Sequence, residues 1–285
     1  MTAIVLQESV ATDAQLIQLW VHGKSKTTAR YYLSEADRFL AFVGKSLAMV
    51  TLADLQAYAD ELDNLGLQVS SQSRSLSVVK SLLTFGQKIG VLTFNVGAVL
   101  TMPKAKNKLS ERILSESEVH GMIALETNHR NKLIIKLLYG AGLRVSELCD
   151  LKWCDLKPSG ESGQITVFGK GGKTRSVLLP VALYHDLQAL RGDKSHDEPI
   201  FMSRKGHGHL DPSMVMRIVR AAAARVGITQ NVSPHWLRHC HASHSLDRGA
   251  PITLVQQTLG HSNVATTSKY LHARPNDSSA RYLAV

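Results

Sequence analysis

Hydrophobic residues between residues 12 and 92 recur at spacings of three and four, which is the period of a helix buried on one face. The pattern divides into four segments. It predicts helices capped at Thr12, at Thr27 or Thr28 and at Thr51, and a fourth helix from about Ser70 to Lys88. Strand-like alternation is nearly absent, so we expect a small helical bundle.

After residue 112 the pattern changes, because helical segments alternate with short strand-like runs. Residues 164–168 and 174–179 have the composition of strands, and the glycine-rich residues 169–173 between them are typical of a hairpin turn. Residues 199–202 resemble a further short strand. Helices are predicted to begin at Ser115, near residue 131, at Ser146, at Pro180 and at Asp211. The expected fold class is mainly α with a small antiparallel β-sheet.

The periodic pattern is interrupted between residues 101 and 112. Pro103 breaks it, and several cations follow with few apolar residues among them: Lys104, Lys106, Lys108 and Arg112. A chain of 285 residues is long enough for two hydrophobic cores. We therefore expect a helical domain at 1–100, a basic linker at 101–112 that could follow a phosphate backbone, and a second domain with a C-terminal tail at 113–285.

The net charge of +10 and the pI near 9.6 indicate a polyanionic partner. Nucleic acid fits better than a membrane, because no apolar run reaches the roughly 20 residues that a spanning helix requires. The apolar residues 3–6 are too few for a secretory signal. A cytoplasmic location is the expectation.

Cysteines and histidines raise the question of a metal site. Cys149, Cys154 and Cys240 are odd in number and are expected as buried, reduced thiols. Four histidines crowd one segment beside Cys240: His235, His239, His241 and His244. His235 and His239 have helical ligand spacing, but no second ligand pair completes a tetrahedron, so no metal is expected.

Two segments carry candidate chemistry. Ser233 and Pro234 predict a helix start, which places His235 and Arg238 on one face near free backbone N–H groups, an arrangement that binds anions. Further on, Gly260 should end a helix, and Ser262 or Asn263 should cap the next one. That helix is expected to carry Tyr270 about two turns beyond His261. By itself a tyrosine here is an ordinary amphipathic core residue.

Taken in order, these motifs resemble the tyrosine recombinase (phage integrase) family, and within it the short Xer-type recombinases. The resemblance rests on Gly142–Leu148, Gly169–Gly171, the His-x-x-Arg-His run from His235, Leu259–His261 and Tyr270. It covers nearly the whole chain, since the N-terminal helices resemble the family's SAM-like core-binding domain and the rest its α+β catalytic domain. It implies a site-specific recombinase that cleaves and rejoins DNA through a 3′-phosphotyrosyl intermediate, exchanging strands between two duplexes.

The resemblance also implies a role for each matching residue. Tyr270 would be the nucleophile, Arg144 and Arg238 the clamp on the scissile phosphate, Lys170 the general acid, His235 a proton-transfer group, His261 a phosphate ligand and Glu147 an orienting acid. Two planar guanidinium groups suit this clamp, because each can donate two parallel hydrogen bonds to phosphate oxygens. Lys173 is the rival of Lys170 by proximity. Lys104, Lys106, Lys108 and Lys173 are further candidates for DNA contact.

Several expectations follow for partners and cofactors. A tyrosyl phosphate keeps the energy of the broken bond, so no cofactor is expected. The implied partner is double-stranded DNA with a specific core site, bound by a homo- or hetero-tetramer whose tail docks in cis or in trans. Cys240 and His241 depart from the family pattern, with altered packing as the expected result. The alternatives are a topoisomerase IB-like enzyme that relaxes DNA and a non-catalytic DNA-binding regulator on the same fold.

Overall fold

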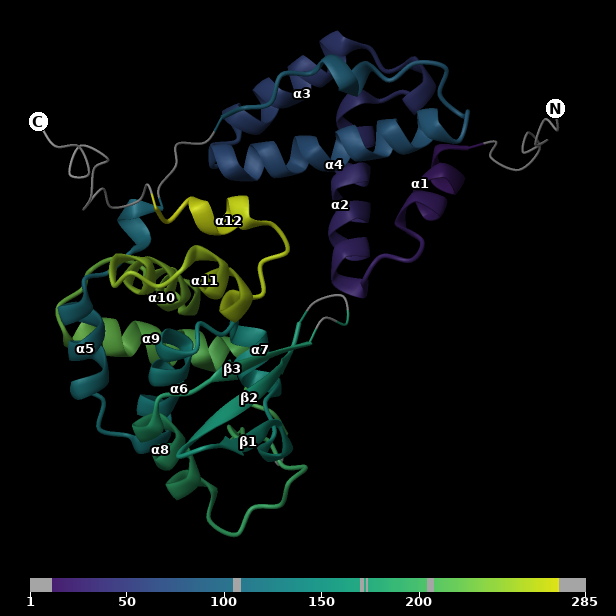
Figure 1. Ribbon diagram of the computed structural model, residues 1–285. Helices are drawn as coiled ribbons and strands as arrows, with labels where there is room; N and C mark the ends of the chain where they lie inside the picture. Colours follow the sequence, from purple (N-terminus) through teal and green to yellow (C-terminus); the bar gives the residue numbers. More distant parts are fainter. Residues whose placement is uncertain (1–11, 105–108, 170–171, 173, 204–207, 272–285) are drawn as a thin grey trace, which may run out of the picture. The chain divides into compact units, whose positions relative to one another are not determined.

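The computed structural model describes residues 12–104, 109–169, 172, 174–203 and 208–271 (Figure 1). The chain forms two compact units, Met1–Lys106 and Asn107–Val285, and each is described by itself. No helix in the described ranges has both the length and the apolar character to cross a membrane.

Within residues 12–104, the first unit is a bundle of four helices. These are α1 (Asp13–Val21), α2 (Lys26–Val43), α3 (Leu52–Asn64) and α4 (Val69–Lys88), with 3-10 turns at η1 (Leu47–Met49) and η2 (Val96–Val99). Thr12 and Thr51 cap α1 and α3 as predicted, each within a complete capping box. The predicted cap of α2 was wrong: Ser25 caps it by accepting a hydrogen bond from the backbone N–H of Thr28, which places Thr27 and Thr28 inside the first turn.

The second unit combines helices with one small sheet. Its elements are η3 (Ser110–Arg112), α5 (Glu116–Ala124), α6 (His129–Gly140), α7 (Val145–Asp150), η4 (Trp153–Asp155), β1 (Leu156–Ser159), β2 (Ser162–Phe168), β3 (Thr174–Leu178), α8 (Val181–Arg191), α9 (Pro212–Arg225), α10 (Pro234–Asp247), α11 (Ile252–Leu259) and α12 (Val264–Ser268). Helix α10 packs against α5, α6, α9 and α11, so it lies at the centre of the unit. The predicted fold class is confirmed.

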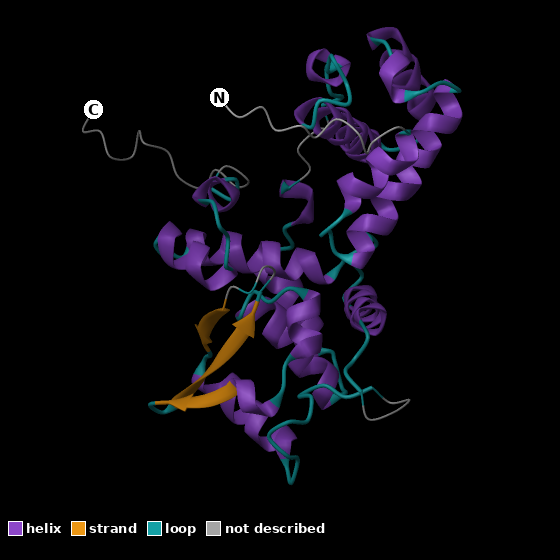
Figure 2. Ribbon diagram, turned by 90° about the vertical axis from the view of Figure 1, so that its right-hand side faces the viewer, coloured by secondary structure: helices purple, strands orange, loops and turns teal. Residues whose placement is uncertain are grey.

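The sheet is antiparallel, with strand order β1–β2–β3, and Figure 2 shows its strands in orange. The predicted hairpin is present, and its last pair before the turn joins Phe168 to Thr174. Strand β1 was not predicted. The strand expected at 199–202 is wrong, since this segment makes only isolated bridges at Pro199 and Met202. Strand β2 packs against α8 and β3 packs against α11, which brings the hairpin close to the residues that follow α11.

The segment between the two units is described at both ends. Residue Pro103 packs in the first unit, where its carbonyl accepts a hydrogen bond from the Ser73 hydroxyl at 2.6 Å. Residues 110–112 form η3, which contacts α10 in the second unit. Lys104 is exposed, and Lys106 and Lys108 lie outside the described residues. The 101–112 linker stays a prediction.

The cysteines differ in their exposure. Cys149 and Cys240 are buried as expected, but Cys154 is exposed, so the expectation of three buried thiols was wrong. The reason is local: in the η4 turn, Trp153 occupies the buried position and is completely covered, which leaves its neighbour facing outward.

Candidate active site

Helix α10 carries the His-x-x-Arg-His run at its N-terminal end. Ser233 occupies the N-cap position with extended backbone and Pro234 is the first helical residue, as predicted. The Ser233 side chain, however, makes no capping hydrogen bond. Arg238 and His239 follow the first turn of α10, and both are buried inside the unit.

Arg238 is held by backbone carbonyls. Its guanidinium is 1% exposed and donates to the Gly142 carbonyl at 2.5 Å and to the Leu259 carbonyl. Gly142 has a φ of +59°, and a Cβ there would lie 2.7 Å from the Leu259 side chain, so this close approach requires glycine. Burial, with the charge of Arg144, lowers the Arg238 pKa to about 10, which leaves the group cationic at neutral pH.

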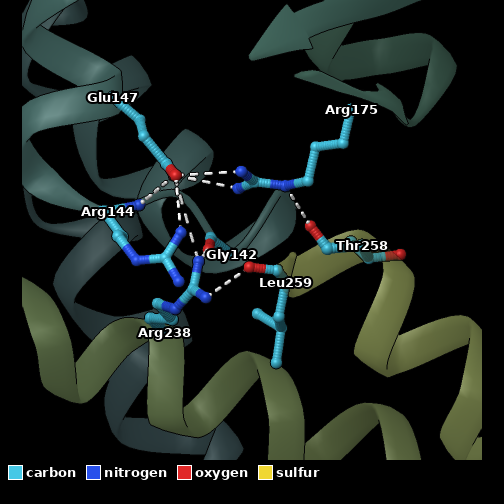
Figure 3. Close-up of polar contacts among 7 residues, drawn as sticks. All are labelled: Gly142, Arg144, Glu147, Arg175, Arg238, Thr258 and Leu259. Atoms are coloured by element: carbon cyan, nitrogen blue, oxygen red, sulfur yellow. Dashed lines mark hydrogen bonds and ion pairs between the residues drawn. The ribbon is translucent and has the colours of Figure 1, made fainter. Parts of the chain in front are cut away.

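Glu147 on α7 is the meeting point of three arginines (Figure 3). Its carboxylate lies 2.7 Å from Arg144, 2.8 Å from Arg175 and 3.9 Å from Arg238. Burial alone would raise the Glu147 pKa, but hydrogen bonds from Arg175 and Arg144 outweigh burial and bring the pKa to about 2. The single negative charge of Glu147 is thus surrounded by three guanidinium groups, so the net charge of this cluster is positive.

Arg175 was missed at the sequence level. It lies on β3 opposite Val167, on the same side of the strand as the buried Val177. An arginine in the buried phase of an alternating strand is a usable signal, because such a charge requires a partner inside the protein. Here the partners are Glu147 and the Thr258 carbonyl.

A cavity of about 590 Å³ opens beside these charges. The described residues that line it are Arg144, Ser146, Glu147, Phe168, Gly169, Thr174, Arg175, Gly260, His261 and Ser262. Arg144 is the most open of the three arginines, with 37% of its side chain exposed. The cavity is therefore suited to an anion that Arg144 can reach. Lys170 and Lys173 lie outside the described residues, although Gly169 and Thr174 beside that turn line the cavity.

His261 follows the predicted end of α11 at Gly260, which has a φ of +63°. Its Nδ1 lies 2.9 Å from the Thr267 hydroxyl, and its ring lines the cavity. Burial first, and then the charges of Arg238 and Arg144, lower the His261 pKa to about 4. The imidazole is therefore neutral at physiological pH and available for a hydrogen bond to a bound anion.

Tyr270 lies just beyond α12, which Asn263 caps as predicted. The helix ends at Ser268, so the expectation that it carries Tyr270 was wrong, and the tyrosine occupies the following turn. Its hydroxyl is hydrogen-bonded to Nδ1 of His239 at 2.7 Å, and the residue is 6% exposed. Burial raises the Tyr270 pKa, while Arg238 opposes that rise.

His239 was not predicted as the tyrosine's partner, since the resemblance gives proton transfer to His235. Burial, together with His235 and Arg112, lowers the His239 pKa to about 3. The two histidine rings stack edge to face at a centroid distance of 4.4 Å. Burial also lowers the pKa of His235, with Arg238 and Arg144 adding to that effect. The tyrosine side of the site is thus neutral and closed, and the described residues that line the cavity do not include Tyr270.

The remaining histidines of α10 face other partners. Nδ1 of His241 lies 2.7 Å from the Tyr139 carbonyl, and His244 bridges the Tyr139 hydroxyl and the Leu114 carbonyl. Cys240 accepts a hydrogen bond from the Leu114 N–H. Among the described residues, no group of three His, Cys, Asp or Glu side chains is arranged to hold a metal ion.

Comparisons with known proteins agree with this architecture. Residues 111–277 match the phage integrase family, and residues 15–88 match the SAM-like N-terminal domain of phage integrases. A tyrosine recombinase of Thermosipho africanus is 32% identical over 88% of this chain and 90% of that protein. Tyrosine recombinase XerA of Pyrococcus horikoshii is 34% identical over 88% of this chain and 85% of its own length.

A solved structure extends the likeness to the fold. A lambda integrase tetramer bound to a Holliday junction has a TM-score of 0.73 at 18% identity, covering 93% of this chain and 78% of that one. The family match covers more than half of the chain, and the recombinase relatives cover most of it. The chain belongs to the phage integrase family and is a tyrosine recombinase.

Proposed function

We propose that Tyr270 is the nucleophile with which this recombinase cleaves and rejoins DNA strands. The observation that carries the proposal is the convergence of Arg144 and Arg238, which are distant in sequence, on one carboxylate beside a cavity that Arg144 lines. Tyr270 is tied to the same helix as Arg238, through the neighbouring residue His239.

The reaction needs no outside reagent. The Tyr270 oxygen attacks the scissile phosphorus, its proton passes to an imidazole, and the 5′ oxygen of the DNA leaves with a proton from a general acid. His239 is the imidazole in contact with the phenol, and His235 is the one that the resemblance implies. Lys170 is the proposed acid. Rejoining reverses these steps, since the 3′-phosphotyrosyl bond keeps the energy of the broken linkage.

The clamp acts on the charge that develops in the transition state. Guanidinium groups fixed before the reaction stabilise a pentacoordinate phosphorane without reorganising, which favours the transition state over the ground state. Because the Tyr270 hydroxyl is covered and bonded to His239, attack requires it to leave His239 for a phosphate held in the cavity.

The proposed partner is duplex DNA with a specific core site, bound through the basic surface that the net charge of +10 predicts. Four protomers, of one or two kinds, are needed to exchange strands between two duplexes, and the lambda integrase neighbour was solved as a tetramer on a Holliday junction. Lys104, Lys106, Lys108 and Lys173 are proposed DNA contacts. The tail after Pro275, which lies outside the described residues, is proposed to dock in cis or in trans. The protein is proposed to act in the cytoplasm.

The test is covalent capture on a nicked suicide duplex. The wild-type protein and Tyr282→Phe should both form a protein–DNA adduct, and Tyr270→Phe should form none while binding DNA with unchanged affinity. Tyr282 is the matched control because it is the other tyrosine near the C-terminus. An adduct with Tyr270→Phe, or its loss with Tyr282→Phe, would reject the assignment.

A further inference from the structure

Arg175 makes more contacts with Glu147 than either clamp arginine makes through its side chain. Its Nη1 donates to one carboxylate oxygen at 2.9 Å and its Nη2 to the other at 2.8 Å. Its Nε donates to the Thr258 carbonyl at 2.6 Å. The side chain is 12% exposed, so this is a fixed, largely dry arrangement in which planar geometry matters.

These bonds fill the carboxylate. An ionised carboxylate offers about four acceptor positions. Arg175 occupies two, and Arg144 occupies the others with its backbone N–H at 2.8 Å and its Nη1 at 2.7 Å. Arg238 lies at 3.9 Å, beyond hydrogen-bond distance, and its own donors go to backbone carbonyls. With Arg175 present, Glu147 has no free acceptor position for Arg238, so Arg238 keeps its hydrogen bonds to the backbone carbonyls.

Removing Arg175 would change this balance. A buried carboxylate with two open acceptor positions is costly, and the nearest cations able to fill them are Arg144 and Arg238. Arg144, which lines the cavity, would turn further toward Glu147, and Arg238 would leave the Gly142 and Leu259 carbonyls for the carboxylate. Both guanidinium groups would then be misplaced relative to an incoming phosphate.

We propose that Arg175 is a positioning residue of the recombinase, which saturates Glu147 and thereby keeps the guanidinium groups of Arg144 and Arg238 directed at the scissile phosphate. The proposal rests on the proposed function, because it assumes that these two arginines hold the phosphate.

The same side chain fixes a second part of the cavity wall. By binding the Thr258 carbonyl, Arg175 joins β3 to the last turn of α11, directly before Gly260 and His261. A Cβ on Gly260 would lie 3.1 Å from Cδ of Arg175, so the glycine lets the arginine pass close to the backbone. Arg175 therefore sets the spacing between Glu147 and the end of α11, which His261 follows.

The test measures single-turnover cleavage of the suicide duplex at saturating DNA, together with DNA affinity and the melting temperature. Arg175→Met keeps the length of the side chain but removes its charge and fork. We expect its cleavage rate to fall on the order of a hundredfold, because small misplacements of reacting groups reduce rates by about that factor. Its affinity for DNA should change much less. Arg175→Lys keeps the charge without the planar fork and should fall between Met and wild type.

A double-mutant cycle with Glu147→Gln distinguishes positioning from direct contact with DNA. If Arg175 acts by saturating the Glu147 charge, Arg175→Met should cost only a few-fold in the Glu147→Gln background. Equal losses in both backgrounds would overturn the proposal, since they would mean that Arg175 acts independently of the carboxylate, through the DNA or through the Thr258 carbonyl alone. Full activity of Arg175→Lys would overturn it as well.

Arg225→Met is the matched control for stability. Arg225 also pairs with a buried carboxylate, Glu126, at 2.9 Å, and does not line the cavity. Its loss should lower the melting temperature and leave cleavage unchanged; a comparable rate loss in this control would attribute the Arg175 effect to stability and overturn the proposal. If Arg175→Met does not fold, Arg175→Lys replaces it in the double-mutant cycle with Glu147→Gln. A wild-type protein without an adduct on Tyr270 would instead reject the proposed function.

Discussion

Two consecutive residues of α10, Arg238 and His239, belong to opposite kinds of surroundings. On the Arg238 side, three guanidinium groups gather around Glu147, and Arg144 and Arg175 line an open cavity. On the His239 side, a buried phenol meets a neutral imidazole. The half of the site proposed to bind phosphate is thus charged and already assembled, whereas the proposed nucleophile, Tyr270, is protonated and covered.

The difference has a direct chemical benefit. A permanently exposed tyrosinate would react without selection, but a phenol kept protonated by burial becomes reactive only near a bound phosphate and the arginines around it. Burial is the main cause of the low pKa values of His239 and His261, and nearby positive charges lower them further; a bound anion would offset this second contribution and so favour transfer of the phenol proton to an imidazole. On the proposed mechanism, binding the phosphate would therefore make an imidazole a better acceptor for the phenol proton.

The largest predicted effect separates the two clamp arginines. Arg144→Ala and Arg238→Ala should each reduce cleavage by on the order of a hundred- to a thousandfold, the usual cost of losing one donor to a developing charge. Only Arg238→Ala should also lower the melting temperature, by roughly 5 °C or more, because buried carbonyls of Gly142 and Leu259 lose their donor. Single-turnover cleavage and thermal unfolding measure the two effects.

Arg144 is the built-in control for that comparison, because its side chain is more exposed and its side-chain partner is Glu147 rather than a backbone carbonyl. Equal melting temperatures for the two variants would contradict the structural role given to Arg238. Normal cleavage by either variant would remove it from the clamp.

An intermediate effect concerns acid. The pKa values of His239 and His261 are lowered to about 3 and about 4, and those of His235 and His241 are lowered too, whereas unfolded histidines titrate near 6.5. Between these limits the unfolded chain binds more protons, so stability is complete above about pH 6.5 and falls as the pH drops toward the folded values. Glu147, with a pKa near 2, contributes its own loss only at lower pH.

Thermal unfolding from about pH 7.5 down to about pH 5 should therefore show a falling melting temperature. His239→Gln should show a shallower fall, because it removes the histidine with the lowest of these pKa values. A melting temperature that does not change over this range would contradict a neutral, buried histidine beside the nucleophile.

The smallest expected effect lies outside both halves of the site. Cys154 is exposed, whereas Cys149 and Cys240 are buried and burial raises the Cys149 pKa to about 12. A maleimide should label Cys154 alone in the folded protein, and Cys154→Ser should leave cleavage and melting temperature unchanged. Rapid labelling of Cys240 would show that α10, which carries Arg238, unfolds locally and exposes the buried thiol.

The helical part of the fold was predictable because its signals are local. The caps at Thr12, Thr51 and Asn263 and the stop at Gly260 follow from side-chain chemistry within one turn. Strand β1 was missed because Pro158 weakens a strand pattern, although an edge strand of a small sheet tolerates it.

The site was predictable only in part. Motif order indicated Arg144, Glu147, Arg238 and His261, which the structure brings together around the cavity or through Glu147. Arg175 and His239 were missed because their roles depend on strand register and on how the Tyr270 turn folds back on α10. The strand alternation could have marked Arg175 as an arginine in need of a buried partner, but sequence spacing does not say which distant residue that partner is.

The most direct test of the account is to identify the residue that carries the DNA. A nicked suicide duplex is cleaved by the wild-type protein, the adduct is digested, and the phosphodeoxynucleotide-bearing peptide is sequenced by mass spectrometry. We predict a single linkage, on Tyr270, to the 3′ phosphate of the cleaved strand. Linkage to Tyr282 or to a 5′ phosphate, or cleavage without any covalent adduct, would contradict it.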